Sequence, residues 1–546
     1  MNVSVDSVGQ LQSQIADSVK FQITELKISG PLNGTDLKFM QQIVNRTADG
    51  KLKQLIKGRA KSAKQAAEER FVTLVDLSDA IIMEGKDGMK TLQNELPADL
   101  FAGAKNLQKV VLPPNITNIS KDCFDGCTSL EEVNIPETVT TIGSNAFQNC
   151  ETLAAISLPA SITAIGSDAF RGCKQLTTIT IPEKVLTIEN GTFRNCQSLK
   201  EIKLPDDLKS VGNDAFRECS TLQTIELSDK TTDIGNSAFE QCDNLTTIQM
   251  SGVKTVGNNA FEQCKSLEEV TFDELKKLGS GAFKNCSSLT TAKIDGTLDA
   301  IPMNTFDGCT SLAEVSLPVG LKTIGGAAFH DCQALKTIEL PISLQKLNDH
   351  VFENCSSLRE VVIPSTVKSM GASIFEGCLS LDSVAINGFL TEIESDAFRG
   401  CHSLRYISLP SSVKKIGSKA FLECSSLQQI DLPVALLSIG DDAFEKCSAL
   451  TSIRIPVSVN SIGSDAFREC SLLASAELSI SLKKIGGGAF ARCASLREVT
   501  LNSPVPPNIA KSTFKDVVGC TFYIPRGSSM LYKANKDWQK INFREK

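Results

Sequence analysis

The stretch from Phe147 to Phe170, FQNCETLAAISLPASITAIGSDAF, contains the unit from which most of this chain is built. Counting from Phe147, Cys stands at +3, Leu at +6, Ile at +9, Leu at +11, Pro at +12, Ile at +15 and +18, Gly at +19 and Ala at +22. Phe returns at +23, and the same phenylalanine recurs at Phe101, Phe124, Phe147, Phe170, Phe193, Phe216, Phe239, Phe261, Phe283, Phe306, Phe329, Phe352, Phe375, Phe398, Phe421, Phe444, Phe467, Phe490 and Phe514. This fixed period predicts a solenoid of about 19 turns, each burying its apolar side against its neighbours.

Length and net charge indicate one long repeat domain and exclude several kinds of partner. A repeat array extends its core in one dimension, so 546 residues are compatible with one long solenoid. The formal net charge of -7 argues against nucleic acid and anionic membranes as partners, because both require a basic face. No segment approaches the roughly 20 apolar residues of a membrane span, and residues 1–30 lack a charged start followed by an apolar run. We therefore predict no nucleic-acid partner and no membrane span.

Within each unit, the pattern L-x-x-[IV]-x-[LIF]-P indicates a short strand that ends at the proline, because proline cannot donate the next ladder hydrogen bond. Strands of successive units are expected to pair in parallel, about 4.8 Å apart. A second apolar run and a glycine turn follow the proline, as in Val139, Ile142 and Gly143. Equivalent side chains then stack, and the predicted structural ladder includes Phe147, Cys150, Phe170, Cys173, Phe306 and Cys309.

Before Leu96 the repeat is irregular. Residues 1–20 have apolar side chains at helical spacing, which predicts an amphipathic helix with Val8, Leu11, Ile15 and Val19 on one face. Further on, we expect strands at 23–29 and 71–77, a helix at 36–44, and turns at Gly30–Pro31 and Asn33–Gly34. The predicted organisation is an N-terminal cap at 1–95, repeats at 96–525 and a C-terminal cap at 526–546.

Residues 51–70 form a basic, alanine-rich stretch that predicts a helix. One interpretation is a docking site for an acidic partner. The other is a solvated helix inserted between irregular repeats.

Nineteen cysteines are the next notable feature. Seventeen of them, from Cys127 to Cys493, stand three residues after a repeated phenylalanine and so occupy one position per turn. No C-x-x-C pair occurs and the chain has three histidines, so the sequence lacks the ligand spacing of known zinc sites. We therefore expect no metal and no cofactor. Parallel Cβ vectors disfavour disulfides between stacked neighbours. The cysteines are predicted to be reduced, buried thiols, and Cys123 and Cys520 to be core residues as well.

Catalysis has little support in the sequence. Ser, Asp and Glu are spread evenly, so a catalytic triple can be drawn by chance anywhere. His330 and His402 flank ladder cysteines, but those thiols are predicted to be buried, which leaves no accessible Cys–His pair. We expect a protein that is not an enzyme.

A binding surface is the better hypothesis. The outward positions of the predicted strands are polar, rich in Thr, Ser and acidic residues, and interface hot spots favour Trp, Tyr and Arg, so this face suits extended contacts of modest affinity. The predicted binding face comprises Glu132, Asn134, Thr178, Thr180, Glu201, Lys203, Thr247, Gln249, Glu314, Ser316, Tyr406, Ser408, Gln429, Asp431, Ser452 and Arg454. The C-terminal aromatic residues Phe522, Tyr523, Tyr532 and Trp538 either cover the last repeat or form a partner site.

Three phrases carry a resemblance to a known family: LPASITAIGSDAFRGC (158–173), LPSSVKKIGSKAFLEC (409–424) and IPVSVNSIGSDAFREC (455–470). They look like the BspA-like, or Treponema pallidum-type, leucine-rich repeats of surface proteins from host-associated anaerobic bacteria. The segments LKISGPLNGTDLKF and YIPRGSSMLYKANKDWQKINF resemble the N- and C-terminal ends of such proteins from gut Bacteroidetes. The resemblance covers residues 96–525. It implies an α/β repeat solenoid, a right-handed superhelix with a parallel β-sheet on one face.

The same resemblance implies a function. It predicts a cell-surface or secreted adhesion module that binds extracellular matrix proteins, other host surface proteins or other bacteria, and we expect it to be a monomer. The alternative is an intracellular protein–protein interaction scaffold in the cytoplasm.

Overall fold

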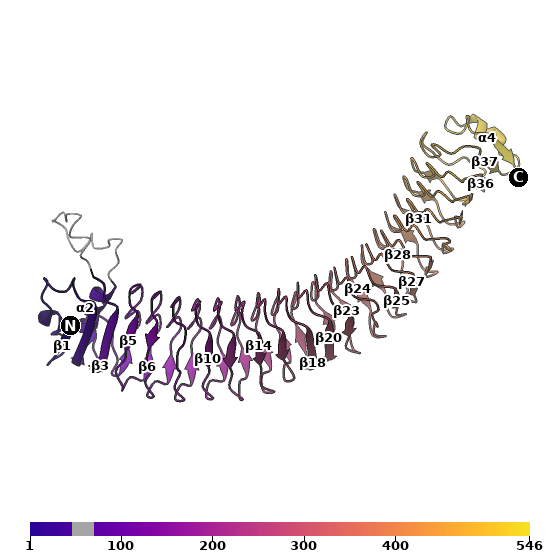
Figure 1. The fold of residues 1–546 in the computed structure, drawn as a ribbon. Helices are drawn as coiled ribbons and strands as arrows, with labels where there is room; N and C mark the ends of the chain where they lie inside the picture. Colours follow the sequence, from indigo (N-terminus) through magenta and orange to yellow (C-terminus); the bar gives the residue numbers. More distant parts are fainter. Residues whose placement is uncertain (46–69) are drawn as a thin grey trace, which may run out of the picture. The chain divides into compact units, whose positions relative to one another are not determined.

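The computed structural model describes residues 1–45 and 70–546 and forms a solenoid with a period of about 23 residues, as predicted. Two compact units make up the chain, unit 1 (Met1–Gly279) and unit 2 (Ser280–Lys546). Within each unit, successive turns lie side by side in chain order (Figure 1). Residues 51–69 of the predicted basic helix lie outside the described residues. Within the described ranges, no helix has both the length and the apolar composition needed to cross a bilayer.

Strands that precede the proline pair in parallel and form the first strand ladder. Equivalent residues of neighbouring turns are in register, as in Thr178 opposite Glu201. In unit 1 this ladder consists of β1 (Asn2–Ser4), β2 (Glu25–Leu32), β3 (Leu74–Ile82), β5 (Lys109–Val111), β7 (Glu132–Val133), β10 (Thr178–Thr180), β12 (Glu201–Lys203), β14 (Thr224–Glu226), β16 (Thr247–Gln249) and β18 (Glu269–Leu275). In unit 2 it consists of β20 (Thr291–Gly296), β22 (Glu314–Ser316), β25 (Glu360–Ile363), β27 (Ser383–Ile386), β29 (Tyr406–Ser408), β32 (Ser452–Arg454), β34 (Ser475–Leu478), β36 (Glu498–Leu501), β37 (Thr521–Ile524) and β38 (Phe543–Glu545).

A second strand ladder, of two-residue strands, follows the proline. In unit 1 it consists of β4 (Glu95–Leu96), β6 (Asn118–Ile119), β8 (Thr141–Ile142), β9 (Ala164–Ile165), β11 (Thr187–Ile188), β13 (Ser210–Val211), β15 (Asp233–Ile234), β17 (Thr255–Val256) and β19 (Lys277–Leu278). In unit 2 it consists of β21 (Ala300–Ile301), β23 (Thr323–Ile324), β24 (Lys346–Leu347), β26 (Ser369–Met370), β28 (Glu392–Ile393), β30 (Lys415–Ile416), β31 (Ser438–Ile439), β33 (Ser461–Ile462) and β35 (Lys484–Ile485). The predicted parallel sheet on one face is confirmed by the first strand ladder. The second strand ladder was not predicted, because such short strands leave no alternating pattern in the sequence.

Stacked phenylalanines fill the interior of both units, as predicted. Phe147 and Phe170 have ring centroids 5.4 Å apart and planes inclined by 1°, and in unit 2 Phe306 and Phe329 are also 5.4 Å apart. All of these side chains are fully buried. Each ring touches the rings of neighbouring turns, so its contacts are made between turns.

The cysteine prediction is confirmed for the seventeen ladder positions and for Cys123, all of which are reduced and buried. Ladder thiols donate to carbonyls of the preceding turn: Cys150 Sγ donates to Phe124 O at 3.3 Å and Cys309 Sγ to Phe283 O at 3.1 Å. Burial raises the pKa of Cys173 to about 12, so this thiol stays protonated. Cys520 is the exception, because it precedes β37 and is only partly buried.

The recurring glycine has a steric role that differs from the predicted bend. A Cβ added to Gly166 would lie 2.5 Å from the backbone nitrogen of Ser144, and one added to Gly463 would lie 2.4 Å from the carbonyl carbon of Gly440. Neither distance is compatible with an unshifted backbone. Glycine at these positions therefore allows successive turns to approach closely.

The predicted helix over residues 1–20 is wrong. Strand β1 opens the chain and pairs in parallel with β2, and only α1 (Leu11–Gln14) is helical. Leu11 is buried, but Val8 and Val19 are exposed. The backbone N–H groups of Gly9 and Leu11 donate to the carboxylate of Asp36 at 2.6 and 2.9 Å, and these bonds hold the segment against another part of the chain.

The other N-terminal predictions fared better. The strand predicted at 23–29 overlaps β2, the strand at 71–77 overlaps β3, and the helix at 36–44 is part of α2 (Gly34–Val44). Gly30–Pro31 is not a turn but lies within β2. At the other end of the chain, the last helix is α4 (Ser529–Ala534).

Candidate binding surface

All sixteen residues of the predicted binding face are exposed, on strands of the first strand ladder or beside them. Their order follows from the period-2 alternation of a strand, in which Ile179 points inward while Thr178 and Thr180 point outward. Parallel pairing then places outward residues of neighbouring turns opposite one another, as with Thr180 and Lys203. The surface is therefore a set of polar columns that run from turn to turn.

A hollow of about 650 Å³ lies on this face in unit 1. Five of its lining residues belong to the predicted binding face: Glu132, Thr178, Thr180, Glu201 and Lys203. Ala155 and Ser157 also line it, and in their turn only a single bridge, from Ala155 to Thr178, joins the ladder. Small side chains between longer neighbours explain why the surface is recessed here.

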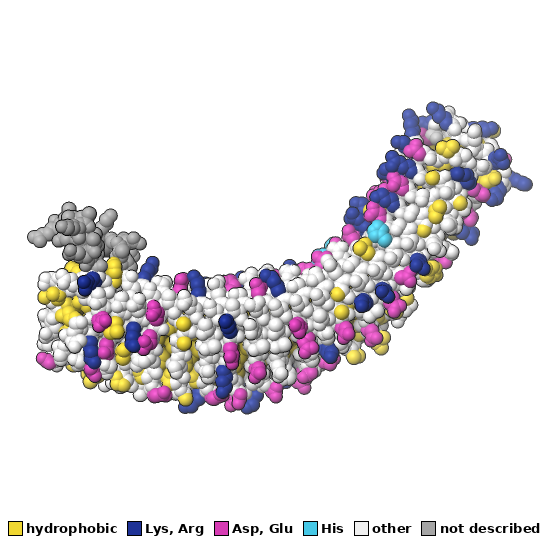
Figure 2. Space-filling view, in the orientation of Figure 1, with side chains coloured by type: hydrophobic (Ala, Val, Ile, Leu, Met, Phe, Trp, Pro, Cys, Tyr) yellow, Lys and Arg dark blue, Asp and Glu magenta, His cyan; other side chains and the backbone are white. Residues whose placement is uncertain are grey.

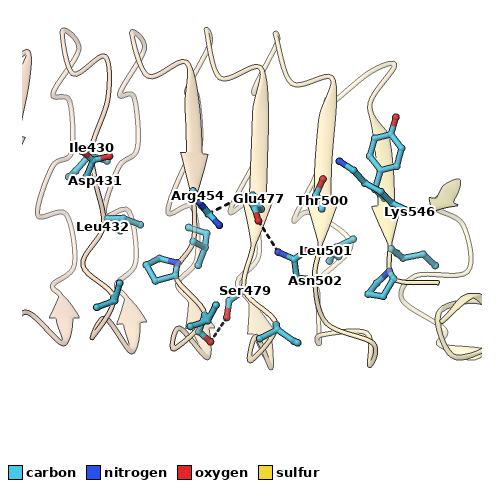
Figure 3. Close-up of a pocket in the computed structure, with 18 residues that line it drawn as sticks. Ile430, Asp431, Leu432, Arg454, Glu477, Ser479, Thr500, Leu501, Asn502 and Lys546 are labelled. Carbon is cyan, nitrogen blue, oxygen red and sulfur yellow. Dashed lines mark hydrogen bonds and ion pairs between the residues drawn. The ribbon is translucent and has the colours of Figure 1, made fainter. Parts of the chain in front are cut away.

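A larger groove, the C-terminal groove, crosses the last turns of unit 2 (Figure 3). Its volume is about 800 Å³, and Asp431 and Arg454 are the residues of the predicted binding face that line it. Arg454 Nε lies 3.3 Å from Glu477 Oε2, and Asn502 Nδ2 donates to Glu477 Oε1 at 3.1 Å. Lys546 Nζ lies 5.1 Å from the ring centroid of Tyr523. The groove therefore combines charged, amide and aromatic groups along several turns.

One feature of this surface was missed in the sequence. The residue that follows the proline, or its equivalent in turns without proline, occupies an exposed corner between the two strand ladders, here named the corner position. In unit 1 it is mostly acidic, as in Glu183, Asp206 and Asp229. In unit 2 it is often aliphatic, as in Val319, Ile342, Val434, Val457 and Ile480. The sequence signal is the residue at this one position in successive turns, which changes from mostly acidic in unit 1 to often aliphatic in unit 2.

Hydroxyl groups hold the corner in place. Ser458 Oγ donates to Val434 O and to Leu436 O of the preceding turn, both at 2.6 Å, and Ser343 Oγ does the same to Val319 O and Leu321 O at 2.6 and 2.7 Å. The backbone is thus fixed by the neighbouring turn. The corner side chain itself stays exposed.

The aromatic residues of the C-terminal segment are mostly buried. Trp538 Nε1 donates to Pro507 O at 2.7 Å, and Tyr532 OH donates to Ser503 O at 2.9 Å. Phe522 packs edge-on against Phe514 with ring centroids 4.9 Å apart. Of the two interpretations of this segment, these contacts favour coverage of the last repeat.

His330, one of the two histidines that flank ladder cysteines, has a carboxylate partner. His330 Nδ1 lies 2.7 Å from Asp307 Oδ1, and this hydrogen bond raises the pKa of His330 against the opposing effect of burial. Burial acts to raise the pKa of Asp307, but the hydrogen bond and charge of His330, with Lys284, lower it overall. The thiol of Cys332 donates to Phe306 O instead of to histidine. Across residues 1–45 and 70–546, no cluster of three or more His, Cys, Asp or Glu side chains is arranged to hold a metal.

A model of the BspA-type leucine-rich repeat region matches residues 94–198, 186–301, 276–405 and 391–520. These matches overlap and cover most of the chain. The chain belongs to the BspA-type leucine-rich repeat family. The family assignment agrees with the resemblance that the repeated phrases indicate.

Solved structures extend the comparison. A leucine-rich repeat protein from Bacteroides ovatus is 27% identical, with 82% of this chain and 98% of that chain covered and a TM-score of 0.53. A leucine-rich cell-surface protein from Faecalibacterium prausnitzii is 28% identical over 51% of this chain and 84% of that chain, with a TM-score of 0.35. The T. pallidum leucine-rich repeat protein is 29% identical over 37% and 77%, with a TM-score of 0.25. No curated protein matches the sequence.

Proposed function

We propose that this BspA-type protein is a non-catalytic, cell-surface or secreted module that binds other proteins through its first strand ladder. The observation that carries the proposal is the exposure, in register, of polar residues on this ladder in both units. Family resemblance supports the surface location and the extracellular matrix, host surface proteins or other bacteria as partners. Residues 1–95 and 526–546 are proposed to cap the repeats at 96–525.

The chemistry of the columns defines the mode of binding. Outward residues such as Thr178, Glu201 and Lys203 offer single hydrogen bonds and exposed charges, each of which contributes little alone. Many such contacts repeated from turn to turn give avidity through effective concentration. The partner is therefore expected to be extended or multivalent.

The non-catalytic part of the proposal rests on the state of the nucleophiles. The thiol of Cys332 donates to the backbone carbonyl of Phe306, and burial raises the pKa of this thiol, which suppresses the reactive thiolate. His330 is paired with Asp307, and His350 Nδ1 lies 2.7 Å from Glu353 Oε2. Each group has a structural partner that accounts for its presence.

Biolayer interferometry tests the proposal with purified fibronectin and fibrinogen, two matrix glycoproteins. We expect wild-type protein to bind at least one of them, and the double variant Lys203→Glu/Tyr406→Ala to bind about tenfold more weakly, because both residues are exposed on the first strand ladder. Lys277→Glu, an exposed lysine of the second strand ladder, is the matched control and should leave binding unchanged. Wild-type protein that binds neither glycoprotein, nor intact bacterial cells, would instead favour the intracellular scaffold.

A further inference from the structure

Three neighbouring corner positions form an apolar lane along the C-terminal groove. Val434, Val457 and Ile480 line the groove and are 77%, 68% and 53% exposed. They stand at equivalent positions of consecutive turns, so their side chains follow one another along the groove. Exposed aliphatic side chains in a row are a feature of surfaces that bind other molecules.

The lane is fixed before any ligand binds. Ser458 Oγ holds Val434 O and Leu436 O, and Ser479 Oγ donates to Val457 O at 2.9 Å. Because these bonds restrain the backbone between turns, little conformational entropy remains to be lost on binding. The lane is therefore preorganised.

Polar groups beside the lane suit a polypeptide backbone. Asp431 offers a carboxylate that accepts hydrogen bonds. Arg454 and Asn502 each contact Glu477 through one nitrogen, and the guanidinium and the amide carry further N–H groups that can donate. A peptide main chain needs both kinds of partner at short intervals, which a hydrocarbon chain does not. Alternating side chains of an extended segment would then reach the aliphatic lane.

Basic side chains near one end of the groove favour one orientation of the occupant. Residues 526–546 contain six basic side chains and two acidic ones. Lys546 lines the groove, and exposed Arg526 directly follows Pro525, which also lines it. Figure 2 shows Lys and Arg side chains gathered at the C-terminal end of unit 2. Acidic side chains of an occupant are favoured at this end.

We propose that the C-terminal groove binds an extended polypeptide segment whose aliphatic side chains lie along Val434, Val457 and Ile480 and whose acidic side chains face Lys546 and Arg526. The inference rests on the protein-binding function proposed above and specifies one site and the chemistry of its partner. Its failure leaves the rest of the first strand ladder available for binding.

A displayed library of random linear peptides, selected against the full chain, tests the inference. We expect the selected sequences to be enriched in aliphatic residues next to a cluster of Asp and Glu. A fluorescein-labelled peptide of the consensus sequence then serves as the probe in fluorescence anisotropy.

The lane is tested with Val457→Ser/Ile480→Ser. This variant should raise the Kd of the probe peptide about tenfold or more, because each aliphatic side chain loses an apolar contact. Val319→Ser/Ile342→Ser is the matched control, since both residues are corner positions of the same unit, are 81% and 80% exposed, and lie outside the groove. The control should bind like wild type.

Charge is tested with Arg526→Glu/Lys546→Glu. The double reversal should weaken the probe about tenfold and reduce the dependence of its Kd on salt. Lys536→Glu, an exposed lysine of the same segment that does not line the groove, should change the Kd less than twofold.

Several results would overturn the inference. They are a selection that yields no peptide, a consensus that is basic or lacks aliphatic residues, and lane variants that bind like wild type. Self-association in light scattering that the lane variants abolish would assign the lane to a second copy of the chain instead. If fibronectin binds through Lys203 and Tyr406 but no peptide is selected, the groove inference is rejected and the proposed function is retained. If peptides are selected but no matrix protein binds, the groove inference is retained and binding of matrix proteins is rejected.

Discussion

At the corner position, unit 1 carries Glu183, Asp206 and Asp229, whereas unit 2 carries Val434, Val457 and Ile480. Both units nevertheless have the same interior, with Phe rings stacked about one turn apart and thiols bonded to carbonyls of the preceding turn. The two regions thus share the residues that stabilise the turns and differ at a position that faces solvent. The difference indicates that the corner position can vary between the units without changing the residues that stabilise the turns.

Removing a ring is the strongest way to test the common interior. Phe147→Ala in unit 1 and Phe306→Ala in unit 2 should each cost about 3–5 kcal/mol, because both leave a cavity between stacked neighbours. Hydrogen exchange measured by mass spectrometry reports the loss turn by turn. A variant in one unit that leaves its neighbouring turns as protected as in wild type would contradict the shared stacked core.

Close approach of turns should matter equally in both units. Gly166→Ala and Gly463→Ala each place a Cβ within 2.5 Å of a backbone atom of the preceding turn, and we expect a cost of about 1–3 kcal/mol. Urea denaturation monitored by circular dichroism measures it. Gly320→Ala is the control, since an added Cβ there meets no atom within 4 Å. Equal effects at Gly320 and Gly463 would show that close approach of turns is not the reason why glycine recurs at this position of the repeat.

Exchanging the corner residues sharpens the contrast between the units. Asp206→Val and Val457→Asp should each change the free energy of unfolding by less than about 0.5 kcal/mol, because both side chains are exposed. Val457→Asp should also abolish binding of the probe peptide, while Asp206→Val leaves it unchanged. A large loss of stability in either variant, again by urea denaturation, would mean that the corner side chain is part of the core.

The smallest expected difference between the units is the dependence of their stability on pH near neutrality. All three histidines lie in unit 2, and the pair with Asp307 raises the pKa of His330. A raised folded-state pKa means that the pair contributes its full stability below about pH 6.5 and loses it as pH rises through the folded-state value. Histidine NMR titration should give a midpoint for His330 above the usual value, and Asp307→Asn should return it toward 6.5. An unshifted midpoint in wild type would refute the pair.

Repetition made the interior predictable. Phe147 and Cys150 recur with the same neighbours in so many turns that their burial follows from spacing alone. The outward positions, including Thr178 and Lys203, followed from alternation about Ile179 in the same way. The strands of the second ladder, such as β11, were missed because two residues carry no period.

Features made by a single turn or by distant segments were harder to predict. Val8 and Val19 fit a helical face, yet bonds from Gly9 and Leu11 to Asp36 determine the path of that segment, and sequence spacing does not reveal such a contact. The hollow in unit 1 depends on Ala155 lying between longer side chains of other turns. The C-terminal groove is formed in part because the last residue, Lys546, lies beside Tyr523, and sequence spacing does not reveal this contact.

The hydrogen bonds that ladder thiols donate to carbonyls of the preceding turn have a consequence for how such genes change in length. Cys150 and Cys173 each need only the turn before them, and a stacked ring such as Phe147 needs only the two turns beside it. Duplication or loss of one whole turn therefore recreates every contact at the new junction. Tandem copying of about 69 nucleotides, three for each residue of a 23-residue turn, lengthens the protein without a new core having to evolve.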